Sequence, residues 1–255
     1  MKRFVCQGLT VHYGATLSLW NLSFSVDQGG LIGIIGPNGA GKSSFIQAAM
    51  GQIQPSSGKV LFWGHPLSHV AEKVTYMPQK GSIDWNFPIT VFDVVLMGRY
   101  HKMRFWKRPR KADLLLAEEA LEKVGMHHLK DKQIGELSGG QQKRVFFARA
   151  LVQGGKIYFL DEPFQGVDLE TETIIMLLLQ ELAEAGSTLF VVHHDLHTVK
   201  KYFSDLLLLN RSLIDFGPVE KVFTEKNLHL LYRKTPFLFE EADALSRGSQ
   251  QGIYL

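Results

Sequence analysis

The chain has 255 residues, of which 45% are hydrophobic, and its formal net charge is +3 at pH 7. This length can bury a large core, as one large α/β domain or as one domain with an insertion. The mild charge does not require a nucleic-acid partner. A single cysteine, Cys6, excludes an internal disulfide framework and a cysteine-rich metal site, and it is typical of a reducing compartment.

The sequence shows no signal-peptide pattern at its start and no apolar run of about 18 residues. Its longest apolar stretches are short or are interrupted by Asp93 and Asp205. We therefore expect a soluble protein that reaches a membrane only through a partner.

Residues Phe4 to Asp27 alternate apolar and polar positions, which predicts an antiparallel pair of strands. Tyr13 lies in a turn-like setting before Gly14. It is either an ordinary aromatic residue at a strand end or a face on which a nucleobase stacks, and the pattern favours neither.

A glycine-rich stretch follows the next apolar strand, Leu31 to Ile35, which we expect to be buried on both faces. It fills the pattern G-x-x-x-x-G-K-[ST] with Gly36, Pro37, Asn38, Gly39, Ala40, Gly41, Lys42 and Ser43. An amphipathic helix is predicted from Ser43 to Met50. Glycines let backbone N–H groups wrap a phosphate, the lysine reaches the terminal phosphates, and the serine ligates magnesium. The sequence therefore predicts binding of a nucleoside triphosphate.

Two further strands are predicted from Lys59 to Trp63 and from Val74 to Met77, and Gln79 follows the second. A lone glutamine after a strand is more often a polar loop residue than a ligand. From Asp84 to Leu151 helical spacing replaces the strand patterns. We interpret this part, about 84–151, as a helical subdomain inserted into the α/β core.

Between the first two predicted helices of that subdomain, residues 101–111 contain six Lys or Arg residues and two adjacent aromatic residues. A solvated loop is the first interpretation of this basic segment. Contact with lipid headgroups or a membrane partner is the second. Nucleic acid comes third, because the positive charge does not extend over the chain.

After residue 151 the sequence predicts two more strands of the sheet, at 157–160 and 188–192, and a closing hairpin at 206–216. A helix is predicted between the two strands, at 169–185. The two strands end in polar residues, Asp161 and Glu162 after one and His193 and His194 after the other.

Because the carboxyl ends of parallel strands line one crevice, we expect these residues to share a site with the glycine-rich loop. Asp161 is suited to hold magnesium, and Glu162 to polarise an attacking water as general base. His194 is suited to bond the terminal phosphate. Two alternatives stay open. His193, His194 and His197 have i, i+3 and i, i+4 spacings that fit a transition-metal site on a helix face, but Asp195 and Leu196 predict that the helix starts only after the first two histidines. The other alternative is that a histidine at either position is structural.

A second glycine-containing helix start precedes the helix predicted at Gly139 to Leu151. Ser138 is a natural N-cap, but Gly139 and Gly140 each disfavour a helix by about 1 kcal/mol unless the backbone must approach something closely. We interpret Ser138, Gly139, Gly140 and Gln141 as a second phosphate clamp, which serves an ATP bound to another copy of the chain.

These motifs together resemble the ATPase subunits of ABC transporters over nearly all of the chain, from about Phe4 to Phe223. In order, they are GPNGAGKS, YMPQ, LSGGQ, YFLDEP, GVD and VVHHD. The resemblance implies an α/β fold: a P-loop NTPase core with a parallel sheet, an N-terminal antiparallel β subdomain and an inserted α-helical subdomain. It implies an ATP-binding domain over residues 4–236 and a C-terminal tail over 237–255, for which we have no functional interpretation.

The resemblance also implies roles for single residues. ATP is bound by Tyr13, which stacks on adenine, and by Gly36, Pro37, Asn38, Gly39, Ala40, Gly41, Lys42, Ser43, Ser44 and Gln79. Magnesium is held by Ser43, Gln79 and Asp161.

By the same resemblance, Glu162 is the general base and His194 the switch histidine. The residues from Ser138 to Gln141 clamp ATP on the opposite subunit of a head-to-tail dimer, and Asp168 communicates between the two sites.

A narrower similarity is to the ATPases of bacterial manganese, zinc and iron importers, the manganese type most of all. It rests on residues Ser82 to Tyr100 and on the segments QIGELSGGQQKRVFFARAL, DEPFQGVD and VVHHDL. The family docks its membrane subunit after Gln79. Gln165 departs from these relatives, which often have a small residue there, and this difference could alter the dimer contact near Asp168.

We therefore expect the energy-coupling ATPase of a metal-ion importer, with ATP and Mg²⁺ as cofactors. Its expected partners are a second copy of itself, an integral membrane permease and, through the permease, a periplasmic or lipoprotein metal-binding protein, with no nucleic acid. Its expected place is the cytoplasmic face of the cell membrane. The alternative is a soluble ABC-type ATPase acting on nucleic acid or ribosomes.

Overall fold

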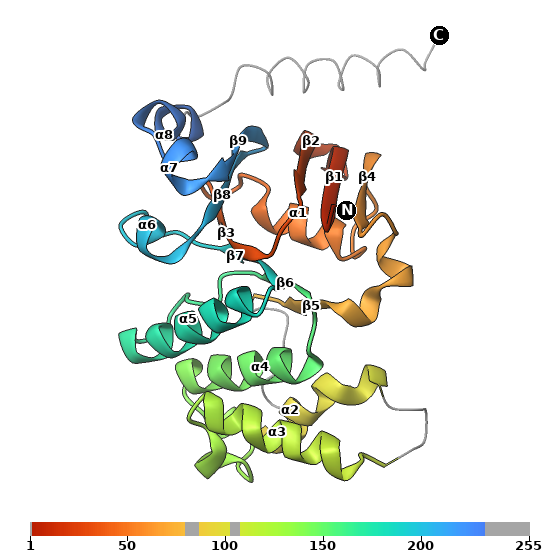
Figure 1. Cartoon of the computed structure of the whole chain (residues 1–255), viewed down its shortest axis with the longest axis vertical. Coiled ribbons are helices and arrows are strands. Elements are labelled where there is room, and N and C mark those ends of the chain that lie inside the picture. Colours follow the sequence, from red (N-terminus) through yellow and green to blue (C-terminus); the bar gives the residue numbers. More distant parts are fainter. Residues whose placement is uncertain (1, 80–86, 103–107, 233–255) are drawn as a thin grey trace. The chain divides into compact units, whose positions relative to one another are not determined.

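The computed structural model describes residues 2–79, 87–102 and 108–232 (Figure 1). The predicted tail, the start of the predicted helical subdomain and the middle of the basic segment lie outside these ranges. The chain divides into two compact units. The first unit is Met1–Gln28, Ile32–His69 and Val192–Leu255, and the second is Gly29–Leu31 and Val70–Val191.

The predicted strands and helices are present, with most boundaries shifted by one or two residues. The strands are β1 Phe4–Tyr13, β2 Thr16–Val26, β3 Gly30–Ile35, β4 Ser57–Phe62, β5 Val74–Met77, β6 Ile157–Leu160, β7 Thr188–Val192, β8 Asp205–Asn210 and β9 Ser212–Pro218. The α-helices are α1 Lys42–Ala49, α2 Val91–Leu96, α3 Lys111–Lys123, α4 Gly139–Gln153, α5 Leu169–Glu184, α6 Val199–Tyr202, α7 Val219–Val222 and α8 Glu225–Leu231. Within the described ranges, no helix combines the length and the apolar composition that crossing a bilayer requires.

One predicted boundary is wrong. We expected a helix to begin at Asp195, but α6 begins only at Val199. The Asp195 carboxylate accepts a hydrogen bond from the backbone N–H of His197, and the Thr198 hydroxyl donates to the Asp195 carbonyl. These local bonds offer the backbone a turn in place of the first helical turn.

The first unit contains the predicted antiparallel sheet, in the order β2-β1-β4. Strand β1 is central, and Phe4 pairs with Val26 on one side and with Phe62 on the other. The buried ring of Phe4 lies 6.0 Å from the ring of Phe45, which belongs to α1. This aromatic contact fixes α1, and therefore the glycine-rich loop that precedes it, against the sheet.

A second group of strands in the first unit supports the same loop. Strand β3 runs parallel to β8, and β8 pairs with β9 in an antiparallel hairpin. The rings of Phe24 in β2 and Phe216 in β9 lie 4.9 Å apart, which joins the hairpin to the antiparallel sheet. The helix α1 follows β3 after the loop, as the sequence predicts.

The second unit is built on three parallel strands, β5, β6 and β7. Every residue of β6 and β7 is buried, as expected for parallel strands covered on both faces. The stacked rings of Phe159 and Phe190, 4.9 Å apart, lie on adjacent strands. Helices α2, α3 and α4 pack together in this unit (Figure 1). The bounds of the inserted helical subdomain stay a prediction.

Candidate functional site

The glycine-rich loop joins β3 to α1 and is shaped by close contacts. A Cβ atom on Gly36 would lie 2.0 Å from the carbonyl oxygen of Leu209 in β8. Gly41 has φ +91, and a Cβ there would lie 2.5 Å from Leu19 Cδ2. Both positions therefore require glycine. The backbone path thus depends on the motif glycines for physical reasons, as the pattern predicts.

Lys42 is placed to present a positive charge to the loop. Its side chain is buried, and Nζ donates hydrogen bonds to the carbonyl oxygens of Gly36 at 2.8 Å and Pro37 at 2.9 Å. The ammonium group therefore lies within the turn of the loop. An α-helix N-terminus next to a buried ammonium group is a suitable cradle for phosphate.

Arg211 and Ser18, which the sequence analysis missed, contact the loop and the start of α1. The backbone N–H of Arg211 donates to Ala40 O at 2.7 Å, and the Arg211 carbonyl accepts from the backbone N–H of Trp20 at 2.7 Å. Arg211 has φ +59, which is uncommon outside glycine. The hydroxyls of Ser18 and Ser44 lie 2.6 Å apart. The sequence offered a hairpin turn at Arg211 but no signal that the turn would contact the loop.

Tyr13 lies at the end of β1 and is 49% exposed. Its hydroxyl donates to Gln47 Oε1 of α1. This contact ties the exposed ring to the helix that follows the glycine-rich loop. Both interpretations of Tyr13 remain compatible with this position, and its stacking on adenine stays a prediction.

The two histidines after β7 have different environments. His193 is buried, its Nε2 lies 2.7 Å from Thr198 Oγ1, and its ring lies 5.3 Å from that of Phe203. Burial lowers the pKa of His193, which favours its neutral form. His194 is exposed. Among the described residues no three His, Cys, Asp or Glu side chains are grouped to hold a metal ion, so the transition-metal alternative has no support. The burial and hydrogen bonding of His193 favour a structural role for this histidine.

In the second unit, two predicted site residues are in direct contact. Glu162 follows β6, and its Oε2 accepts a hydrogen bond of 2.7 Å from Gln79 Nε2. Gln79 is therefore not an isolated polar loop residue. Asp161 is buried, and its backbone N–H donates to Met77 O at 3.0 Å, next to the end of β5. Polar residues at the carboxyl ends of β5 and β6 are therefore in contact, whereas the convergence of Asp161 and Glu162 with the glycine-rich loop stays a prediction.

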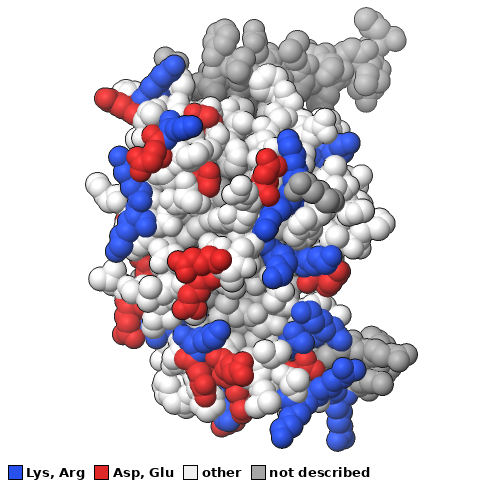
Figure 2. Space-filling model, in the orientation of Figure 1, with Lys and Arg blue, Asp and Glu red and all other residues white. Residues whose placement is uncertain are grey.

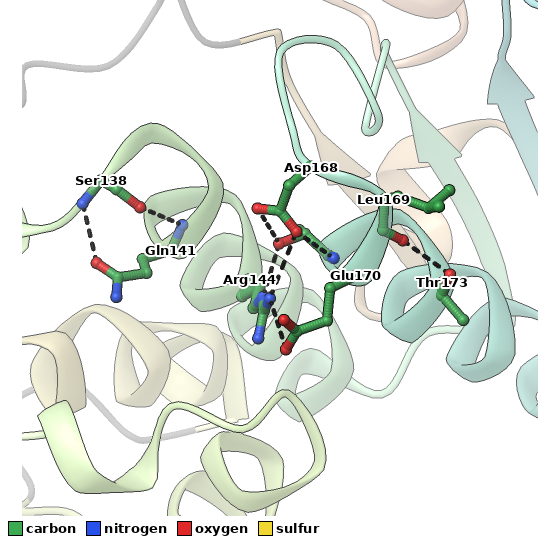
Figure 3. Close-up of polar contacts among 8 residues, drawn as sticks. Ser138, Gln141, Arg144, Asp168, Leu169, Glu170 and Thr173 are labelled. Atoms are coloured by element: carbon green, nitrogen blue, oxygen red, sulfur yellow. Dashed lines mark hydrogen bonds and ion pairs between the residues drawn. The ribbon is translucent and has the colours of Figure 1, made fainter.

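Ser138 caps α4 as predicted (Figure 3). Its hydroxyl accepts from the backbone N–H of Gln141 at 3.3 Å, and Gln141 Oε1 accepts from the backbone N–H of Ser138 at 3.0 Å. The close approach that we inferred for the glycines occurs within the chain, because a Cβ on Gly140 would lie 3.2 Å from Asp168 Oδ2. Gly140 therefore does not by itself require a second copy.

Asp168 is the N-cap of α5 and connects this helix to α4 (Figure 3). Its carboxylate accepts from the backbone N–H and the hydroxyl of Thr171, at 2.8 and 3.0 Å. The backbone bond from Thr171 lowers the pKa of the Asp168 carboxyl. Arg144 of α4 lies 3.8 Å from Asp168 and 3.3 Å from Glu170. The sequence analysis identified Asp168 but not Arg144 or Thr171.

Comparison with known proteins identifies the family. The family model described as ABC transporter matches residues 19–165. The chain belongs to the ABC transporter family. As a member of this family with an intact phosphate loop, it is an ATPase, and the predicted α/β P-loop fold and enzyme class are confirmed.

Three similar proteins define its place within the ABC transporter family. The manganese transport system ATP-binding protein MntB of Bacillus subtilis (strain 168) is 52% identical over 88% of this chain and 90% of its own length. The zinc transport system ATP-binding protein TroB of Treponema pallidum (strain Nichols) is 50% identical over 88% of this chain and 84% of its own. The crystal structure of a nucleotide-free ATP-binding cassette from an ABC transporter, 26% identical, covers 91% of this chain and 95% of its own with a TM-score of 0.74.

These comparisons give no support to the alternative of a soluble ABC-type ATPase that acts on nucleic acid or ribosomes. On the face shown in Figure 2, acidic and basic side chains are interspersed with uncharged surface. ATP-binding subunits of ABC importers work with a membrane permease, so the expected class of partner is confirmed at that level.

Proposed function

We propose that this chain is the energy-coupling ATPase of an importer for a divalent metal ion, with manganese as the first candidate and zinc or iron next. The observation that carries the proposal is the 52% identity, over 88% of the chain, to a manganese transport ATP-binding protein. The transported metal crosses the permease and does not touch this chain.

The phosphate loop, Gly36 to Ser44, holds the triphosphate, and Tyr13 stacks on adenine. Ser43, Gln79 and Asp161 offer the oxygen ligands that Mg²⁺ prefers, and the buried carboxylate of Asp161 suits a cation. Bound Mg²⁺ supplies positive charge that neutralises the phosphate oxygens.

Glu162 is the general base of hydrolysis. Its carboxylate takes a proton from water while the water oxygen forms a bond to the terminal phosphorus atom. The bond from that phosphorus to the bridging oxygen breaks, which releases ADP and phosphate. The amide of Gln79 at 2.7 Å orients the carboxylate, and His194 bonds the terminal phosphate.

A second copy completes each site. The exposed Ser138 and the half-buried Gly139, Gly140 and Gln141 clamp the ATP of the other subunit in a head-to-tail dimer, and Asp168 communicates between the sites. ATP closes the dimer and hydrolysis reopens it. This motion drives a permease at the cytoplasmic face of the cell membrane, which receives metal from a periplasmic or lipoprotein binding protein.

Uptake of radioactive manganese by cells that lack this chain tests the proposal. We expect the wild-type chain to restore uptake and Glu162→Gln to leave it near background, because a general base contributes about 10²–10⁴-fold in rate. Glu184→Gln, at an exposed glutamate in the last turn of α5, is the matched control and should restore uptake fully. Competition with unlabelled zinc and iron ranks the three metals. No restored uptake of any of them would refute metal import.

A further inference from the structure

Four residues of the second unit form a closed ring of polar contacts. Gln79 Nε2 donates to Glu162 Oε2 at 2.7 Å and to Gln165 Oε1 at 3.4 Å. Lys143 Nζ of α4 donates to Glu162 O at 3.1 Å and also to Gln165 O. The ring therefore joins the residue after β5, the turn after β6 and the middle of α4.

The turn that carries Glu162 is held at both of its ends. The backbone N–H of Gln165 donates to Glu162 O at 3.2 Å, which closes the turn. Lys143 binds the carbonyl oxygens of its first and last residues. A single ammonium group thus links both ends of the turn to α4.

The backbone of Glu162 needs such support. Its φ is +53, a conformation that side chains other than glycine rarely adopt and that surrounding contacts must maintain. Lys143 is only 6% exposed, and a buried ammonium group requires hydrogen-bond acceptors. The two carbonyl oxygens provide them, so each partner stabilises the other.

The side-chain half of the ring fixes the orientation of the Gln79 amide. A carboxylate only accepts hydrogen bonds, so the nitrogen of Gln79 must face Glu162. The carbonyl oxygen of Gln165 takes the second contact of the same nitrogen. Gln165, at a position where the resembling importers often have a small residue, therefore contributes to this arrangement.

We propose that Lys143 is a positioning residue for the general base: it holds the Glu162–Gln165 turn so that the Glu162 carboxylate stays aligned with Gln79. The inference rests on the proposed function of Glu162. Lys143 lies on the helix that starts at the clamp residue Ser138. The helix that serves the ATP of a second copy therefore also holds the base of its own chain.

Steady-state ATPase kinetics of the full chain test this role. Lys143→Met keeps the length of the side chain and removes its hydrogen bonds. We expect kcat to fall about tenfold, since misplacing a catalytic group by about 1 Å can cost up to about 100-fold. The KM and the equilibrium Kd for ATP should stay within about twofold, because Lys143 does not act on binding. Lys143→Arg should retain most activity, and Lys123→Met, at an exposed site of α3, should be unchanged.

A double variant separates positioning from a general structural effect. In the Glu162→Gln background, Lys143→Met should cause no further loss of hydrolysis, because the base through which it acts is already gone. An equal loss in both backgrounds, an unchanged kcat, or an increased Kd for ATP would overturn the proposal. If Lys143→Met does not fold, Lys143→Gln replaces it, and normal activity of that variant would overturn the proposal equally.

The same experiment distinguishes this inference from the proposed function. If Glu162→Gln alone hydrolyses ATP at the wild-type rate, the role of Glu162 as general base fails, and the role of Lys143 fails with it. If Glu162→Gln is slow while Lys143→Met is normal, only the positioning role of Lys143 fails.

Discussion

Replacing Gln47 by leucine removes the acceptor that holds the hydroxyl of Tyr13 while leaving the aromatic ring in place. Gln47 lies in α1 four residues after Ser43, so the two side chains share one face of the helix. The bond therefore links the proposed adenine platform to the helix that begins at the phosphate loop. Losing it should let the ring move relative to the bound triphosphate.

The size of the effect follows from the exposure of the pair. A hydrogen bond contributes about 0.5–1.5 kcal/mol net, which corresponds to about 2- to 13-fold in Kd. Tyr13 is 49% exposed, so we expect the lower end, about 2- to 5-fold. Stacking of a base on an aromatic ring contributes about 1–3 kcal/mol, so Tyr13→Leu should weaken ATP binding by about 5-fold or more.

Equilibrium binding of ATP and of inorganic triphosphate separates the base from the phosphates. Gln47→Leu and Tyr13→Phe should each raise the Kd for ATP about 2- to 5-fold. Together they should lose no more than either alone, and the Kd for triphosphate should not change. Gln54→Leu, at an exposed site, is the matched control. Equal weakening of both ligands would refute the reasoning, as would unchanged ATP binding by Tyr13→Leu.

Two further predictions concern stability. Gly36→Ala places a Cβ 2.0 Å from Leu209 O, so Tm should fall by about 6 °C or more from a cost of at least about 3 kcal/mol. The Cβ of Gly39→Ala would meet nothing within 4 Å, so this variant should lose only about 1–2 kcal/mol of stability because of its positive φ. If Gly36→Ala and Gly39→Ala lowered Tm equally, the close contact with Leu209 would not be the cause. A second change tests the ion pair of Arg99 and Asp113, whose 2.8 Å hydrogen bond lowers the pKa of the Asp113 carboxyl. The contribution of this pair to the stability of the folded protein is therefore complete above the ordinary pKa of about 3.9. It is lost as the pH falls through the lowered pKa. Asp113→Asn should lower the free energy of unfolding at pH 7 by about 1–3 kcal/mol, and urea titrations that show the same difference at pH 3 would contradict this assignment.

The fold could be predicted where burial alone decides the structure. The strands β5, β6 and β7 have the predicted bounds, because strands buried on both faces are continuous apolar runs. The start of α6 could not be predicted in the same way. There the carboxylate of Asp195 and the hydroxyl of Thr198 compete with the helix for backbone partners.

Some residues of the candidate site could also be predicted from the sequence, and others could not. The loop from Gly36 to Ser43 could be predicted, because the chemistry of phosphate binding requires the residue types at its four fixed positions, Gly36, Gly41, Lys42 and Ser43. Gln47, Lys143 and Arg211 could not, because their partners are distant in sequence and their residue types are common on any helix or turn. Gly140 was predicted in part. The expected close approach to its backbone exists, but the group that approaches is the carboxylate of Asp168 in the same chain.

Two successive cationic residues of α4, Lys143 and Arg144, connect the proposed clamp to the segment of the same chain that carries the proposed general base. Lys143 holds the turn at Glu162, and Arg144 donates to Thr171 Oγ1 at 2.9 Å and lies 3.8 Å from Asp168. The segment from Glu162 to Thr171, which carries the proposed general base and Asp168, is therefore attached to α4 at each end. Figure 3 shows the end at Arg144. In the proposed dimer, ATP bound by one copy would press on the clamp of the other, and that clamp belongs to the helix that positions the other copy's base. The two sites would then be coupled through a helix and not through the nucleotides, which explains physically why both sites would respond to the occupancy of either one.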